Sequence, residues 1–344
     1  MDIQQAIGRV VERQDLNAEQ MTSVMTAIMT GEATPAQIGG FLIGLRMKGE
    51  TVEEITAAAQ VMRGLSDKVS LNVDNIVDTC GTGGDGQHLF NVSTASAFVA
   101  AAAGANVAKH GGRSVSSKSG SADVLEQAGI YLGLTAEQVS RCVQEIGVGF
   151  MFAPNHHAAM KYAVGPRREM ATRTIFNLLG PLTNPAGATR QVMGVFAKEW
   201  VRPIAEVLKQ LGSEHVLVVH SEDGLDEISL AAPTFVAELK NGEISEYSIQ
   251  PEDFGIASQP LASVQALDAE SSLAMVKQAL EGKGQVNGPR DIVALNAGAA
   301  IYVSGVADSL AEGVAMAEDV IGGGVAKIKL SELASFTRCF KPQD

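Results

Sequence analysis

The sequence contains few cysteines and no pattern of metal-binding histidines. Its three cysteines, Cys80, Cys142 and Cys339, form no CxxC pair and leave one thiol over under any pairing. This usage is typical of a reduced cytoplasmic protein rather than of a disulfide-rich secreted one. The six histidines form no HxxxH or HExxH motif, which argues against a zinc site.

Long apolar segments are also missing. The N-terminal stretch MDIQQAIGRVVERQ contains Asp2 and Arg9 and lacks the apolar core of a signal peptide. The most apolar stretch, residues 97–108, is interrupted by Gly104 and Asn106 and is too short to cross a bilayer. We therefore expect a cytoplasmic protein without a membrane partner.

Positive charge is scarce. Lys and Arg number 26 against 39 Asp and Glu, a net charge of −13, and charged residues make up only 19% of the 344. A uniformly acidic surface repels phosphate backbones, so nucleic acid is not expected as a partner. The chain is rich instead in apolar residues, at 46%, and in glycine, with 36. This length and composition predict about two globular domains with many tight turns.

The first 70 residues predict a small bundle of short antiparallel helices. Asn17, Thr34 and Thr51 are each followed three positions later by Gln or Glu, which is the capping-box signal of a helix start. Gly31 and Gly49 stand where C-terminal caps belong.

From about residue 74, short apolar strands alternate with helical segments. The pair Asn241-Gly242 between two strand-like segments predicts a β-hairpin. Residues 158–180 return to a helical pattern, which we expect Pro166 to break. The alternation predicts an α/β domain in which helices wrap a mostly parallel sheet. The expected parallel strands lie near residues 76–77, 107–108, 149–152, 192–196 and 216–219.

A glycine-rich loop, GTGGDG at 81–86, follows the first strand and formally satisfies the dinucleotide motif G-x-G-x-x-G. That motif requires an acidic residue about 20 positions on. Lys109-His110 stands there instead, so the dinucleotide interpretation fails. A glycine loop ahead of a helix still predicts a phosphate site, and a turn without a ligand is the alternative. Asn91, Ser93 and Thr94 then serve either as phosphate ligands or as plain helix caps.

A second loop, residues 109–121, contains three cations, five serines and three glycines in an otherwise acidic chain. This composition favours an anion site over a solvated surface loop. A third segment, DGLDE at 223–227, follows a strand that ends near His220 and supplies carboxylates suited to Mg²⁺. Because loops at the carboxyl ends of parallel strands converge, the three segments predict a site for a Mg²⁺-bound diphosphate ester.

Long motifs around these loops carry a resemblance to a known family. They are DTCGTGGDG (78–86), NVST (91–94), KHGGRSVSSKSGSAD (109–123), PRRE (166–169), FNLLGPLTNP (176–185) and DGLDE (223–227). With them the chain resembles the anthranilate phosphoribosyltransferases of tryptophan biosynthesis over essentially its whole length. The resemblance implies transfer of 5-phosphoribosyl from phosphoribosyl diphosphate to the amine of anthranilate. It also implies a homodimer formed through a helical domain of residues 1–72 with 158–190, beside an α/β domain of residues 73–157 with 191–344.

The resemblance also implies site residues, position by position, with no dedicated catalytic base. The residues implied for Mg²⁺ are Ser93, Asp226 and Glu227, and those implied for anthranilate are Gly81, Gly112 and Arg167. The residues implied for phosphoribosyl diphosphate are Gly81, Gly84, Asp85, Asn91, Val92, Ser93, Thr94, Lys109, His110, Gly111, Arg113, Ser114, Ser116, Ser117 and Ser121.

One position departs from the family pattern. The family motif is KHGN, and this chain has Gly112 in place of the asparagine. Because that asparagine is associated with the acceptor, the departure predicts altered anthranilate binding. Two alternatives stay open at this point, a pyrimidine nucleoside phosphorylase-like enzyme and a nucleic-acid-binding paralogue.

Overall fold

The computed structural model describes the whole chain except residues 85, 114–118, 282–286 and 343–344. The expected substrate residues Asp85, Ser114, Ser116 and Ser117 therefore lie outside the described residues.

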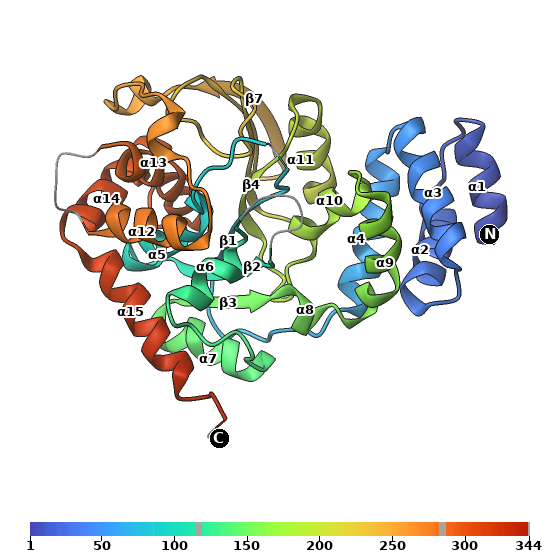
Figure 1. Ribbon diagram of the computed structural model, residues 1–344. Coiled ribbons are helices and arrows are strands. Elements are labelled where there is room, and N and C mark those ends of the chain that lie inside the picture. The colour runs from blue at the N-terminus through green and yellow to red at the C-terminus, as the bar shows by residue number, and fades with distance from the viewer. Residues whose placement is uncertain (85, 114–118, 282–286, 343–344) are drawn as a thin grey trace.

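The N-terminal helices form the expected bundle, which stands as a separate blue lobe in Figure 1. The predicted capping boxes at Asn17, Thr34 and Thr51 are all present, with hydrogen bonds in both directions. Gly31 ends its helix in the left-handed conformation, which confirms the predicted cap. The four helices are α1 (Ile3–Val11), α2 (Ala18–Thr30), α3 (Pro35–Lys48) and α4 (Val52–Leu65).

Two later helices join this bundle. Helix α9 (Lys161–Met170) packs against α2 and α3, and α10 (Ile175–Leu179) packs against α3 and α4. The expected break at Pro166 is wrong, because Pro166 lies inside α9. The proline ring is buried, so packing offsets the one backbone hydrogen bond that it removes.

The described part of the α/β region contains a seven-stranded sheet in the order β3-β2-β1-β4-β5-β6-β7. Neighbours from β3 to β5 are parallel, and β6 and β7 pair in antiparallel fashion. Asn241 and Gly242 both have positive φ at the β6–β7 turn, which confirms the predicted hairpin. The strands are β1 (Ile76–Gly81), β2 (Asn106–Gly111), β3 (Val148–Phe152), β4 (Arg190–Gly194), β5 (His215–Ser221), β6 (Thr234–Lys240) and β7 (Glu243–Ile249).

Helices cover both faces of the sheet and create two hydrophobic cores. The first core joins one face to most of the helices, and the second joins the other face, through α11 (Val201–Gln210), to the helical bundle. No described helix is long and apolar enough to cross a membrane. The remaining helices of eight or more residues are α5 (Val92–Ala102), α7 (Ala136–Ile146), α12 (Ala269–Leu280), α13 (Asn287–Ser304), α14 (Leu310–Gly322) and α15 (Val325–Arg338).

A buried ion pair ties the bundle together. The Glu54 carboxylate accepts from the backbone N–H of Leu16 at 2.9 Å and of Thr51 at 2.8 Å. The Lys48 ammonium donates to the same carboxylate at 2.9 Å and to Asp15 at 2.7 Å. Glu54, on α4, thus links α3 and the connection between α1 and α2 through one fully buried side chain.

We predict that Glu54→Ala lowers the free energy of unfolding by about 3–5 kcal/mol, because it leaves Lys48 and two backbone donors buried without this partner. Chemical denaturation measures the change. The neighbouring exposed Glu53, which accepts from one exposed N–H group, is the control, and Glu53→Ala should cost no more than about 1 kcal/mol. Equal losses in the two variants would contradict the role given to the buried carboxylate.

Candidate active site

Two of the three predicted loops meet at the carboxyl edge of the sheet. The N–H of Gly83, in the glycine loop after β1, donates to Oδ2 of Asp226 at 2.6 Å. Asp226 belongs to the loop after β5, and β4 lies between β1 and β5 in the sheet. The first loop is also tied to the end of β4, because Thr82 N–H donates to the Gly194 carbonyl at 2.9 Å.

This contact requires two glycines on neighbouring strands. Gly81 and Gly194 are register partners at the ends of β1 and β4. A Cβ atom on Gly81 would lie 2.3 Å from Oδ2 of Asp226, and one on Gly194 would lie 1.5 Å from the Asp226 carbonyl oxygen. Both positions are therefore restricted to glycine if the Asp226 loop is to approach the sheet this closely.

The glycine loop has the backbone of an anion site. Gly83, Gly84 and Gly86 all have positive φ, which only glycine adopts readily. The hydroxyl groups of Thr82 and Thr94 are buried and have no hydrogen-bond partner among the described residues. A buried hydroxyl without a partner is costly, so these two groups fit a polar ligand such as a phosphate.

The N-terminus of α5 lies beside this loop and has no side-chain cap. Asn91 occupies the cap position, but its Oδ1 accepts from Ser272 Oγ at 2.7 Å and from Ser119 Oγ at 3.2 Å. The plain-cap interpretation of Asn91 is therefore wrong. The uncapped N–H groups of this helix start remain suited to an anion.

Lys109, in β2, contacts the two elements that flank the glycine loop, β1 and α5. Its ammonium group donates to the Thr79 carbonyl and lies 3.3 Å from Ser93 Oγ. Lys109 is only 3% exposed, so its positive charge is placed in a largely dry position, two residues before the end of β2. Ser93 is in turn fixed through its carbonyl, which accepts from Thr79 Oγ1 at 3.0 Å.

His110 and Arg113 follow Lys109 but are engaged elsewhere. The His110 ring lies 5.0 Å from the ring of His157, and burial lowers the pKa of His110 to about 3 and that of His157 to about 4. Both rings are therefore neutral near pH 7. The Arg113 guanidinium pairs with Asp123 at 2.7 Å and Glu126 at 2.9 Å. Their roles toward phosphoribosyl diphosphate stay predictions.

Gly111 and Gly112 differ in the space around them. A Cβ on Gly111 would lie 2.4 Å from Ser121 Oγ, so Ser121 packs directly against the end of β2. A Cβ on Gly112 would meet only Ala153 Cβ, at 3.9 Å, among the described residues. The structure therefore has room for a side chain at Gly112.

Arg167 lies on α9 of the helical bundle. It is partly buried, its guanidinium stacks over the Phe176 ring at 5.1 Å, and burial lowers its pKa. In the part of the chain that the structure describes, Arg167 has no carboxylate partner. A partly desolvated guanidinium of this kind suits the carboxylate of a ligand.

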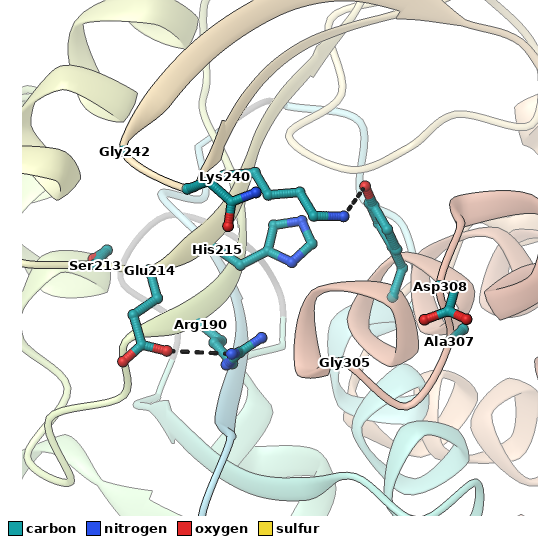
Figure 2. Close-up of a pocket in the computed structure, with 11 residues that line it drawn as sticks. Arg190, Ser213, Glu214, His215, Lys240, Gly242, Gly305, Ala307 and Asp308 are labelled. Atoms are coloured by element: carbon teal, nitrogen blue, oxygen red, sulfur yellow. Dashed lines mark hydrogen bonds and ion pairs between the residues drawn. The ribbon is translucent and has the colours of Figure 1, made fainter.

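A cavity of about 530 Å³ lies where β4 and β5 begin, at the opposite ends of these strands from the candidate site (Figure 2). Figure 2 shows Arg190 and Lys240 on either side of the His215 ring. Arg190 already donates to the Val303 carbonyl at 3.0 Å and pairs with Glu214, and Lys240 donates to the Tyr302 hydroxyl at 3.0 Å. These two cations therefore bind groups near the C-terminal end of α13. The three loops remain the candidate site.

Comparisons with known proteins show the family of the chain. Family models described as the α/β domain and the helical bundle domain of a glycosyl transferase family match residues 73–327 and 4–66. An anthranilate phosphoribosyltransferase of Marinomonas sp. is 79% identical over 344 residues, covering 100% of this chain and 99% of that protein. One from Cellvibrio japonicus is 65% identical over 340 residues, covering 98% and 99%. The chain belongs to the anthranilate phosphoribosyltransferase family.

Solved structures of this family share the fold. The Thermus thermophilus enzyme has a TM-score of 0.91 and 41% identity, with 97% of this chain and 99% of that chain covered. The Saccharomyces cerevisiae enzyme in complex with phosphoribosyl diphosphate and Mg has a TM-score of 0.90 and 25% identity, with 98% of each chain covered. These matches confirm a small helical bundle domain beside a larger domain with a mostly parallel sheet. They give no support to the phosphorylase or nucleic-acid alternatives.

Proposed function

We propose that the chain transfers the 5-phosphoribosyl group of phosphoribosyl diphosphate to the amine of anthranilate. The observation that carries the proposal is the contact between Asp226 and the glycine loop, with Lys109 and Ser93 beside it. Backbone donors, an ammonium group and a carboxylate together suit a diphosphate that is bound with a divalent cation. The family membership supports the same reaction.

The residues present fit Mg²⁺. Asp226 and Glu227 supply carboxylate oxygens and Ser93 supplies a hydroxyl oxygen, which are the hard ligands that Mg²⁺ prefers. Among the described residues, no group of three His, Cys, Asp or Glu side chains could hold a metal ion by itself. This agrees with an ion held partly by the substrate diphosphate. When bound, Mg²⁺ would offset the negative charge of the leaving diphosphate.

In the reaction, the bond from the anomeric carbon to the diphosphate oxygen breaks and a bond to the anthranilate nitrogen forms. The uncapped N–H groups at the start of α5 and the Lys109 ammonium stabilise the charge that develops on the departing diphosphate, because the N–H groups of Thr82 and Gly83 already donate within the protein. Arg167 binds the anthranilate carboxylate and thereby orients the amine. An aryl amine is neutral near pH 7, so its lone pair can attack without a dedicated base, and the positively charged nitrogen then releases one of its two protons to water. We propose that the chain carries out this reaction in the cytoplasm.

We further propose a homodimer formed through a helical domain of residues 1–72 with 158–190. Two large apolar side chains on this domain are strongly exposed, Val11 at 68% and Met47 at 70%. They belong to α1 and α3, which pack together, and Val11 lies close to Gly44, one turn before Met47. Exposed apolar side chains that adjoin in this way favour a protein interface.

Replacement of both carboxylates, Asp226→Asn with Glu227→Gln, should lower kcat/KM for phosphoribosyl diphosphate by at least ~100-fold, about 2.7 kcal/mol. The reason is loss of the two charges that would hold the cation on the diphosphate. Steady-state kinetics over a range of Mg²⁺ concentrations measures the effect. Glu222→Gln, an exposed carboxylate on the same loop, is the matched control and should change little. Activity of the wild-type protein that persists in EDTA would contradict this prediction.

Restoring the family asparagine, Gly112→Asn, should lower the KM for anthranilate ~2- to 12-fold, the range of one hydrogen bond worth about 0.5–1.5 kcal/mol. The KM for phosphoribosyl diphosphate should change less, because Lys109 and Asp226 are untouched. Gly322→Asn, at a position with open space around it, is the control for the substitution itself. An unchanged or higher anthranilate KM in Gly112→Asn would show that position 112 is not an acceptor contact.

Sedimentation at micromolar concentration should show one species near twice 35.9 kDa. Met47→Glu should shift the protein toward the monomer, because a buried charge without a partner opposes association. Ile328→Glu, on an exposed apolar position of α15 at 56%, is the matched control and should leave the dimer intact. A wild-type monomer would overturn the proposed interface.

A further inference from the structure

Two buried asparagines lie behind two of the site loops. Asn184 is 5% exposed and Asn296 is 2% exposed. Each makes three hydrogen bonds through its amide group, and most of these bonds go to backbone groups. Neither residue is among those expected to touch substrate or metal.

Asn184 lies in the segment that returns from the helical bundle to the sheet. Its Nδ2 donates to the Ala108 carbonyl at 2.9 Å and to Asp78 Oδ2 at 2.7 Å, and its Oδ1 accepts from Ala186 N–H. Asp78 is fully buried, and its Oδ1 accepts from His110 N–H at 3.2 Å. The backbone is therefore held on both sides of Lys109, at the carbonyl before it and the N–H after it.

Asn296 makes the equivalent contact from α13. Its Oδ1 accepts from Ile228 N–H at 2.9 Å, and its Nδ2 donates to the Ile228 carbonyl at 2.9 Å. A further bond to the Ile292 carbonyl fixes the side chain to its own helix. Ile228 follows Glu227 directly, so Asn296 holds both backbone polar groups of the residue after the carboxylate pair.

We propose that Asn184 and Asn296 are positioning residues of the transfer reaction, Asn184 for the part of β2 that contains Lys109 and Asn296 for the loop after β5. Asn184 holds Lys109 against the diphosphate site, and Asn296 holds the Asp226–Glu227 pair where the cation binds. An amide is suited to both places because it offers a donor and an acceptor at once, which neither a carboxylate nor an apolar side chain does. The inference rests on the proposed function, since the loops owe their roles to it.

The two residues are each other's matched control, because their burial and bond number are alike. Asn296→Ala should raise the Mg²⁺ concentration for half-maximal rate ~10-fold or more, the usual size of a lost outer contact to a metal ligand. Asn184→Ala should leave that concentration within about twofold and lower kcat/KM for phosphoribosyl diphosphate ~10- to 100-fold through misplaced Lys109. Kinetics with magnesium and phosphoribosyl diphosphate varied separately distinguishes the two.

Serine variants at both positions provide a second pair that keeps a polar group and is checked for folding by circular dichroism. Equal effects of the Asn184 and Asn296 variants on both parameters, or none, would overturn the proposal. Unfolding of both the alanine and the serine variants would also overturn the proposal, because it would show that the asparagines stabilise the fold as a whole rather than position the site residues. If the wild-type protein does not transfer phosphoribosyl from phosphoribosyl diphosphate to anthranilate, the proposed function itself is rejected before any variant is compared.

Discussion

The contact of the Asp226 loop with the sheet is the constraint on which the rest of the site depends. It brings a carboxylate within 2.6 Å of a glycine-loop N–H, and it exists because Gly81 and Gly194 have no Cβ. Parallel pairing of β1, β4 and β5 places the ends of these strands at one edge. The sheet topology therefore places the loops after β1 and β5 close together, and the two glycines allow the Asp226 loop to approach the glycine loop.

A second constraint fixes the helical bundle relative to that edge. The Arg63 guanidinium, on α4, donates to the carbonyl of Leu211, the residue that ends α11, at 3.3 Å. The backbone N–H of Asp67 donates to the His156 carbonyl at 2.9 Å, and Nδ1 of the His156 ring lies 3.0 Å from the Asp67 carbonyl oxygen. A shared hydrophobic core runs from the bundle to the sheet through α11. Arg167 therefore lies on a bundle that is packed against the α/β domain, which fits the proposed transfer between two substrates.

The sequence predicts best what depends on neighbours along the chain. Capping boxes and the Asn241-Gly242 turn involve residues a few positions apart, so their patterns are visible in one dimension. The prediction at Pro166 was wrong because the lost backbone hydrogen bond is a local effect, whereas the packing that offsets it is tertiary. Gly194 and Asn296 gave no signal, since their roles depend on contacts with residues 32 or more positions away. The loops could therefore be named from the sequence, but the groups that hold them could not.

An acidic chain with a net charge of −13 can still bind a polyanion, because only the charges and dipoles near the site act at short range. Lys109 is buried near the end of β2, where water screens it little. The uncapped start of α5 adds N–H groups without any net charge. In the proposed site, Asp226 opposes a free diphosphate and attracts one that carries a cation. Under this proposal, the acidic surface repels anions in general, while the site selects the metal-bound diphosphate.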